Sequence, residues 1–474
     1  MSSELLQMLS EHAKTGVYAL HMPGHKRNTA MLGNALPYAL DITEIPGFDD
    51  LHAPSGVLRR LEEQLAALWG ARQSFALVNG ATSGILAGIA SLVSPGDTVL
   101  LARNCHRSVY HALALTGAVP VYLAPPVDAQ SGIAGSISPQ QVEAALAKNP
   151  QTKLVVVTSP TYDGVLSDLA GIVRAAHSRH IAVLVDEAHG AHLAFTENAG
   201  SSAVRAGADV VIHSLHKTLP ALTQCAAAHL CGPFGSAERF RRALAVFETS
   251  SPSYLLLASV AECADFLKTH GAAAFAAYGA RLDAFSEACG ALARLYIPGK
   301  GRDACESHPA FFALDGGKLP VVTARTTLDG VGLARTLRQD FALESEMAAV
   351  SYTLLMTSVC DTKEAFARLS DALLAIDRTA KPIENPPVFS PLPLPERRLT
   401  PQAAAGKAGA LCPLEAAAGK TSLETVFCYP PGTPLLVAGE VVDEAVLRRV
   451  QNAAAHGLAV RSSRGKLPQI AVCD

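Results

Sequence analysis

Short apolar runs alternate with helical patterns through the first half of the chain. Runs without polar positions are typical of strands whose two faces are both buried. The segments between them carry apolar residues at helical spacing, so strand and helix alternate from Phe75 to Leu230. This alternation predicts an α/β fold with a mostly parallel sheet covered on both faces. The expected strands are 75–78, 98–102, 119–123, 153–158, 181–185 and 208–212.

The second half changes in character and predicts further domains. A smaller α+β unit is expected, with strands at 310–314 and 348–355 and helices at 330–340 and 363–376. A proline-rich stretch then predicts a stiff linker. The predicted parts are an N-terminal segment 1–55, a large domain 56–280, a small α+β domain 281–380, a linker 381–401 and a C-terminal α+β domain 402–474.

Composition narrows the class of protein. The chain has 474 residues and a net charge of −3, so neither nucleic acid nor an anionic membrane is expected as a partner. No apolar run reaches the roughly 18 residues that span a bilayer. The ten cysteines form no Cys-x-x-Cys pair, so no metal site is expected. The N-terminus lacks the layout of a signal peptide, and a cytoplasmic location is expected.

Two predicted strands end on residues with complementary chemistry. The strand 208–212 leads into His213-Ser214-Leu215-His216-Lys217, and the strand 181–185 leads into Asp186-Glu187-Ala188-His189. Ligands of open α/β sheets bind beyond the carboxyl ends of the strands. A lysine amine and a carboxylate at one such edge are what pyridoxal phosphate requires, for a Schiff base and for a protonated ring nitrogen. An ordinary surface lysine and acidic loop are the alternative.

A third strand end suits a phosphate group. The strand 75–78 runs into Asn79-Gly80-Ala81-Thr82-Ser83-Gly84 at the start of a helix, where backbone amides and the helix dipole favour an anion. The spacing matches neither Walker A nor Gly-x-Gly-x-x-Gly, so one phosphate fits better than ATP or NAD. A tight turn without function is the alternative. His106 follows the strand 98–102, where a purely structural histidine is also common.

Taken in order, these motifs resemble the group III pyridoxal-phosphate decarboxylases, the Orn/Lys/Arg decarboxylase family. The resemblance implies fold-type I, the aspartate-aminotransferase-like fold. The long members of the family begin with a wing domain, whereas this chain resembles the short form. That resemblance implies a homodimer or a dimer of dimers. The motifs are His21-Met22-Pro23-Gly24-His25-Lys26, Asp41-Ile42-Thr43-Glu44, Asn104-Cys105-His106, Thr161-Tyr162-Asp163-Gly164, Asp186-Glu187-Ala188-His189, Ser214-Leu215-His216-Lys217, Ser251-Pro252-Ser253-Tyr254 and Tyr429-Pro430-Pro431-Gly432.

The resemblance also implies roles for individual residues. Lys217 forms the Schiff base, Asp186 contacts the pyridine nitrogen, Ala188 lies under the ring and His106 stacks on it. The implied phosphate ligands are Thr82, Ser83, Ser214 and His216, with Thr249 supplied from the partner subunit.

The implied substrate is a basic L-amino acid. Glu440 corresponds to a position near the basic end of the substrate, and His189 stands where the long enzymes usually carry an aromatic residue. The expected reaction is α-decarboxylation of arginine, then of lysine or ornithine, which releases CO₂ and a polyamine-pathway amine. An aminotransferase of the same fold and a non-catalytic, antienzyme-like regulator are the alternatives.

Overall fold

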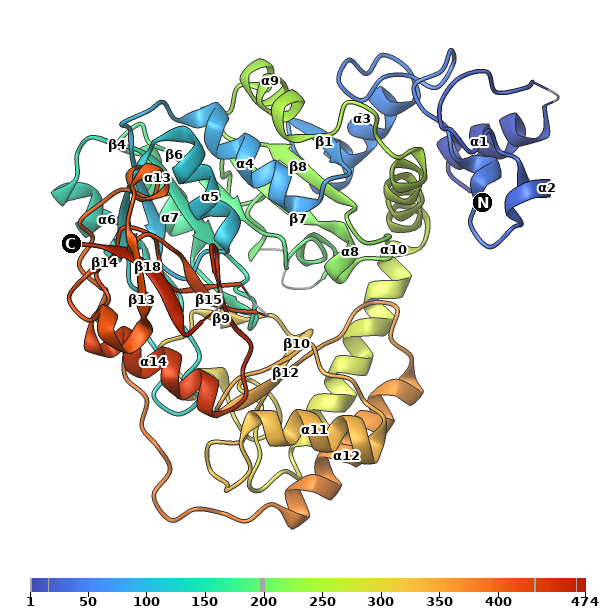
Figure 1. Ribbon diagram of the computed structural model, residues 1–474. Helices are drawn as coiled ribbons and strands as arrows, with labels where there is room; N and C mark the ends of the chain where they lie inside the picture. The colour runs from blue at the N-terminus through green and yellow to red at the C-terminus, as the bar shows by residue number, and fades with distance from the viewer. Residues whose placement is uncertain (1, 16, 197–200, 392, 430–431, 466) are drawn as a thin grey trace. The chain divides into compact units, whose positions relative to one another are not determined.

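The structure is a computed structural model that describes residues 2–15, 17–196, 201–391, 393–429, 432–465 and 467–474. The chain divides into two compact units (Figure 1). The first unit comprises Met1–Ser91 and Leu184–Ala276, and the second comprises Leu92–Val183 and Ala277–Asp474.

The strands of the first unit lie side by side in the order β1-β8-β7-β6. β6 and β7 are parallel, with Asp186 paired to Ile212, whereas β8 runs antiparallel to both β1 and β7. The elements are α1 Glu4–Lys14, α2 Thr29–Leu32, η1 Tyr38–Leu40, α3 Val57–Trp69, β1 Gln73–Leu77, α4 Gly80–Leu92, β6 Ala182–Asp186, η2 Leu193–Phe195, β7 Val210–Ser214, α8 Leu215–Thr218, β8 Ala226–Leu230, α9 Ala237–Phe247 and α10 Tyr254–Cys289.

Two glycines allow α4 to pack closely on these strands. A β-carbon on Gly84 would lie 2.8 Å from Leu77 Cδ1, and one on Gly88 would lie 2.6 Å from Leu184 Cδ1. Both contacts are too short for any larger residue without a shift of the strand side chains. The small residues of α4 therefore fix its distance from the sheet, and β1 leads almost directly into its first turn (Figure 1).

The second unit carries the parallel strands β4, β2 and β3, in that order, together with smaller antiparallel sheets. These sheets have the orders β10-β12-β11, β13-β18-β14, β16-β15-β17 and β5-β9. The strands are β2 Thr98–Ala102, β3 Val119–Leu123, β4 Thr152–Thr158, β5 Val165–Leu166, β9 Ala313–Leu314, β10 Lys318–Val322, β11 Met347–Ala348, β12 Tyr352–Met356, β13 Ala410–Pro413, β14 Thr421–Ser422, β15 Val426–Cys428, β16 Pro434–Leu436, β17 Val460–Ser462 and β18 Gln469–Cys473.

The helices of the second unit cover its sheets, and α11 packs on β12 (Figure 1). Among the described residues, no helix combines the length and apolar character needed to cross a lipid bilayer. The helices are α5 Arg107–Thr116, α6 Pro139–Lys148, α7 Leu169–His177, η4 Cys305–Ser307, α11 Gly330–Phe341, α12 Lys363–Thr379, α13 Pro401–Gly406, η5 Leu414–Ala417 and α14 Glu444–Ala455.

The α/β class predicted from the sequence is confirmed, and two predicted strands need correction. The predicted strand 348–355 is two antiparallel strands, because Ala349 N–H donates to the Tyr352 carbonyl over 2.8 Å and closes a turn. Of the predicted strand 310–314, only Ala313 and Leu314 are extended in a sheet, since Phe311 N–H closes a turn onto His308. β8 is antiparallel, which the apolar pattern alone did not indicate. The predicted domain boundaries stay predictions.

Candidate active site

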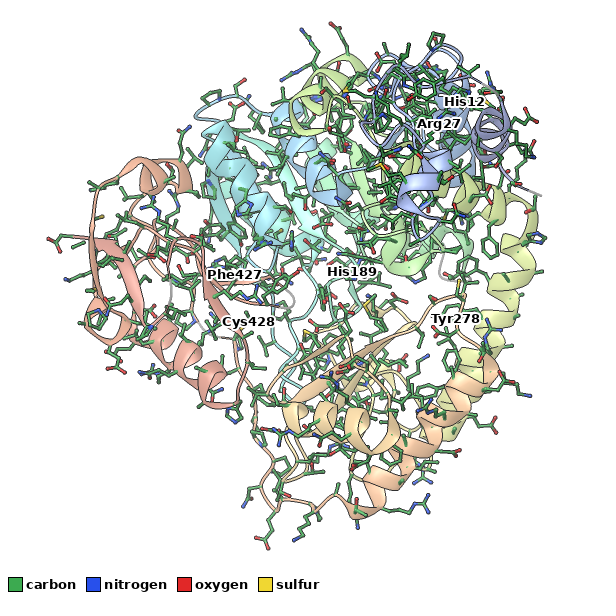
Figure 2. The ribbon with its side chains drawn as sticks, turned by 45° about the vertical axis from the view of Figure 1, so that its right-hand side comes forward. His12, Arg27, His189, Tyr278, Phe427 and Cys428 are labelled. Carbon is green, nitrogen blue, oxygen red and sulfur yellow. The ribbon has the colours of Figure 1, made fainter. Side chains whose placement is uncertain are left out.

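The ends of β6 and β7 bring a lysine and a histidine together. β7 ends at Ser214, and the short helix α8 places Lys217 one turn beyond it. β6 ends at Asp186, and the following loop carries His189, which is labelled in Figure 2. Lys217 Nζ lies 3.0 Å from His189 Nε2, within hydrogen-bond distance. Because β6 and β7 are parallel neighbours, their carboxyl ends share one edge of the sheet, as the sequence predicted.

Asp186 is buried beside this pair. Its side chain is 2% exposed, and Oδ1 accepts a hydrogen bond from the Ala188 N–H over 3.2 Å. Burial raises the pKa of Asp186, while the positive charge of Lys217 and the Ala188 N–H act in the opposite direction. The carboxylate therefore interacts electrostatically with the lysine amine, and it can compensate a second positive charge placed near it.

Two predicted phosphate ligands follow one another on the first turn of α4, but their surroundings differ. Thr82 is exposed, whereas Ser83 is 2% exposed. Ser83 Oγ donates to Glu248 Oε1 over 2.5 Å and also contacts the Gly80 carbonyl at 2.9 Å. The hydroxyl of Ser83 is thus engaged within the protein, which does not support its predicted phosphate role. Thr82 remains the better predicted ligand of the two.

Glu248 is a residue that the sequence reasoning missed. Burial raises its pKa, and hydrogen bonds from Ser83 and from the Val78 N–H partly offset this effect. It ends α9 and directly precedes Thr249. Its carboxyl group therefore joins the start of α4 to the loop that carries Thr249. In the sequence, only the position of Glu248 next to that loop indicated that it could matter for the site.

The remaining predicted ligands of the first unit occupy the end of β7 and the loop after α9. Ser214 is buried at the strand end, and His216 Nδ1 lies 3.1 Å from the Cys225 carbonyl. Burial lowers the pKa of His216, as does the charge of Lys217. The carbonyl of Thr249 lies 2.9 Å from His52 Nε2, so the N-terminal segment supports this loop. The role of Thr249 in a partner subunit stays a prediction.

His106, in the second unit, caps the start of α5. Its Nδ1 lies 2.8 Å from Ser108 Oγ and accepts from the Ser108 N–H at 3.3 Å. A β-carbon on Gly432 would lie 3.4 Å from His106 Cδ2 and Nε2, so two motifs distant in sequence meet there. Pro430 and Pro431 of that second motif lie outside the described residues. The stacking role of His106 stays a prediction.

An aromatic and cationic cluster lies beside this contact. The Arg107 guanidinium lies 5.3 Å from the centre of the Phe427 ring and 5.5 Å from that of Tyr429. Phe427 and its neighbour Cys428 are labelled on β15 in Figure 2. Arg461 lies 4.8 Å from the Tyr429 ring centre, so two guanidinium groups make cation–π contacts with this ring.

Glu440 belongs to a buried ion pair. Its side chain is fully buried, and its two oxygens accept from Arg103 Nε over 3.0 Å and Nη2 over 2.8 Å. One of them also accepts from the Val437 N–H over 2.7 Å. Burial alone would lower the pKa of Arg103, but Tyr110 and Glu440 outweigh it and raise that pKa. The bidentate pairing leaves the carboxylate no exposed oxygen and favours a structural role for this ion pair, so the structure does not support the predicted substrate contact of Glu440, which stays a prediction.

These residues fit pyridoxal phosphate. A lysine amine, a buried carboxylate next to it and the exposed Thr82 at a helix start match the cofactor's aldehyde, ring nitrogen and phosphate. Among the described residues, no three His, Cys, Asp or Glu side chains are grouped so that they could hold a metal ion.

The fold is of type I and is shared with solved structures of a lysine decarboxylase and a serine palmitoyltransferase. The model of the family described as "Orn/Lys/Arg decarboxylase, major domain" matches residues 3–276. The chain belongs to the Orn/Lys/Arg decarboxylase family. This membership confirms the resemblance on which the sequence reasoning relied.

Individual relatives and structures agree with this assignment. An arginine decarboxylase of Halalkalibacterium halodurans is 33% identical, over 95% of this chain and 93% of that protein. The lysine decarboxylase LdcA of Pseudomonas aeruginosa is 31% identical, over 53% of this chain and 38% of that protein. The crystal structure of the Francisella novicida lysine decarboxylase LdcF matches with a TM-score of 0.85 at 20% identity, covering 100% of this chain and 81% of that one.

Proposed function

We propose that this chain is a pyridoxal-phosphate-dependent α-decarboxylase of L-arginine, with L-lysine and L-ornithine as poorer substrates. The observation that carries the proposal is the placement of Lys217, His189 and the buried Asp186 at the paired ends of β6 and β7. The preference for arginine is supported by the arginine decarboxylase that this chain matches over nearly its whole length, while the match to lysine decarboxylase LdcA covers 53% of it.

Asp186 would hold the positive charge of the cofactor ring. When bound, pyridoxal phosphate supplies an electron-accepting ring that weakens the bonds at the Cα of the substrate. A buried carboxylate stabilises a protonated ring nitrogen more strongly than an exposed one, because water does not screen the pair. The 2% exposure of Asp186 therefore suits this role better than a surface aspartate would.

Lys217 and His189 would manage protons. Lys217 must lose a proton to act as a nucleophile, and His189 Nε2 lies 3.0 Å away, where it can accept that proton. A proton held on His189 can return to Lys217 over the same distance. The pair is thus placed to store the proton that Cα needs after CO₂ has left.

The remaining parts of the proposal concern assembly and location. We propose that the working unit is a homodimer in the cytoplasm, in which Thr249 serves the phosphate site of the partner subunit. The half-buried position of Thr249, in a loop supported by His52, is compatible with that role.

The test is an assay of reaction products. The protein is purified, loaded with pyridoxal phosphate and given L-arginine, L-lysine and L-ornithine separately. We expect CO₂ and agmatine in equal amounts from arginine, and slower formation of cadaverine and putrescine from the other two. A 2-oxo acid without CO₂ would identify an aminotransferase and contradict the proposal. The matched control is Lys268→Ala, an exposed lysine on α10 of the first unit, which should retain full activity.

A further inference from the structure

Four buried polar side chains form a continuous hydrogen-bonded chain across the strands of the first unit. Each is 0% exposed, and the indole of Trp69 contacts both imidazole rings of the chain, with centroids 5.5 and 5.2 Å away. The links are Glu187 Oε2 to His213 Nε2 at 2.7 Å, His213 Nδ1 to His229 Nε2 at 3.0 Å, and His229 Nδ1 to Ser74 Oγ at 2.7 Å. The proposed reaction uses none of these groups directly.

Counting protons leaves two arrangements in which every link is satisfied and both imidazoles are neutral. In the first, Ser74 donates to His229, His229 to His213, and His213 to an ionised Glu187, so the chain carries one negative charge. In the second, a protonated Glu187 donates to His213 Nε2 and every later link reverses. The second arrangement is neutral. It places the imidazole protons on Nδ1, whereas the first places them on Nε2.

The surroundings favour the neutral arrangement. Burial raises the pKa of Glu187 well above its ordinary value, and the Ala203 N–H, His192 and Ser202 offset only part of this effect. Burial likewise lowers the pKa of His213 to about 3 and that of His229 well below its ordinary value.

The neighbouring titratable groups act in different directions. A positive charge on His192 would favour an ionised Glu187. Asp186, which precedes Glu187 in sequence, is also buried. Cys231 is a further neighbour of Glu187. Burial raises the pKa of the Cys231 thiol, and a charge on Glu187 would raise it further. Two ionised carboxyl groups on consecutive buried residues would repel each other, and the charge of Lys217 favours an ionised Asp186.

We propose that Glu187 is a protonated, neutral hydrogen-bond donor, and that the Glu187–His213–His229–Ser74 chain positions the ends of β6 and β7 while Asp186 alone carries negative charge there. His213 directly precedes Ser214, and Glu187 directly follows Asp186, so the chain fixes both strand ends from within the sheet. Glu187 and His213 are positioning residues and need not touch substrate or cofactor. The catalytic consequence rests on the proposed function, whereas the proton arrangement does not.

The proton positions can be measured without substrate. Protein labelled with ¹⁵N-histidine gives long-range ¹H–¹⁵N spectra that distinguish Nδ1–H from Nε2–H imidazoles, with assignment from His213→Gln and His229→Gln. We expect protons on Nδ1 of both rings. Protons on Nε2 of both rings, or on both nitrogens of His213, would mean that Glu187 is ionised and would overturn the proposal.

Substitution of Glu187 supplies a second readout. In Glu187→Gln the amide NH₂ can donate to His213 while its oxygen accepts from Ala203, so the Nδ1–H pattern should persist. The pH profile of turnover should move by less than about 0.5 unit, because no charge is removed. A displacement of about one unit or more would show that a negative charge had been lost beside Asp186, and would overturn the proposal.

A variant without a donor completes the test. Glu187→Leu leaves Nε2 of His213 buried without its partner, and turnover should fall by about tenfold or more. Turnover of Glu187→Leu equal to that of Glu187→Gln would overturn the positioning role. Glu63→Gln, an exposed carboxylate on α3, is the matched control and should match the unmodified protein. The spectra decide the proton arrangement even if the chain does not decarboxylate any of the three amino acids, or if Glu187→Leu does not fold.

Discussion

Asp186 in the first unit and Glu440 in the second are both buried carboxylates that the sequence placed in the active site. Both carboxylate oxygens of Glu440 are engaged in hydrogen bonds, because they accept from the Arg103 guanidinium and one of them also accepts from the Val437 N–H. Asp186 instead accepts from the Ala188 N–H and interacts with Lys217 through charge. A buried carboxylate whose hydrogen bonds are complete stabilises the fold, whereas one whose counter-charge sits on a nucleophile is suited to chemistry.

Substitution of Asp186 and substitution of Glu440 should therefore have different effects. Substitution of Asp186 should lower turnover and leave the fold intact, whereas substitution of Glu440 should mainly lower the stability of the fold.

The largest effect is expected from loss of the nucleophile. Lys217→Ala should lower turnover by about 10⁴-fold or more, in the range typical of losing a covalent catalytic residue. It should also abolish the visible absorbance band that a lysine-bound cofactor gives. Turnover assays and absorbance spectra measure both effects. Full activity in this variant would rule out the proposed site.

Breaking the Arg103–Glu440 pair should reduce stability. Glu440→Gln leaves the Arg103 charge buried and unpaired, and should cost about 3–5 kcal/mol of the free energy of unfolding in urea. Glu344→Gln, in the exposed pair Arg338–Glu344, is the control and should cost less than about 1 kcal/mol. If Glu440→Gln changed KM for arginine without loss of stability, Glu440 would contact the substrate after all.

Asp186→Asn should separate binding from turnover. A neutral amide cannot hold the ring nitrogen protonated, so turnover should fall by about 10²–10³-fold. The cofactor should remain bound, because Lys217 is unchanged, and its absorbance and the thermal unfolding curve should confirm this. Near-normal turnover would refute the proposed role of Asp186.

A smaller effect is expected from His308, which lies between two carboxylates in the second unit. Its Nδ1 lies 2.8 Å from Asp128 and its Nε2 lies 2.6 Å from Asp303. Burial acts to lower the pKa of His308, but these two hydrogen bonds outweigh it and raise the pKa from 6.5 to about 9.

Because the folded pKa is raised, the stabilisation is complete below pH 6.5 and is lost as the pH rises through about 9. The difference corresponds to roughly 3 kcal/mol. Urea unfolding between pH 6 and pH 10 should show this loss in the unmodified protein, and a flatter profile in His308→Gln. His456→Gln, at a half-buried histidine that follows α14, is the control and should keep the slope of the unmodified protein. Equal slopes in the unmodified protein and His308→Gln would contradict the assignment.

Much of the sheet could be predicted from the sequence because its strands are buried on both faces. The runs 98–102 and 119–123 are strands with those same bounds. The same apolar pattern could not give strand direction, since β8 is as apolar as a parallel strand but runs antiparallel. The interruption of 348–355 is a local turn closed between Ala349 and Tyr352, and the apolar pattern of this segment gives no sign of it.

The candidate site could be predicted only in part, for a related reason. Strand ends placed Lys217, Asp186 and His189 correctly relative to β6 and β7, because parallel neighbours share an edge. The partners of side chains distant in sequence could not be inferred. Glu440 follows Arg103 by 337 residues, and Glu248 follows Ser83 by 165. Pairing of this kind is fixed by the packed structure, and no local spacing encodes it.

The central claim is that the Lys217 amine is the covalent anchor of the cofactor. The most direct measurement is borohydride reduction of the freshly purified protein, followed by peptide mapping by mass spectrometry. We predict a single pyridoxyl-phosphate adduct on the peptide that contains Lys217, and no adduct in Lys217→Ala. An adduct on another lysine, or no adduct in protein supplied with the cofactor, would contradict it.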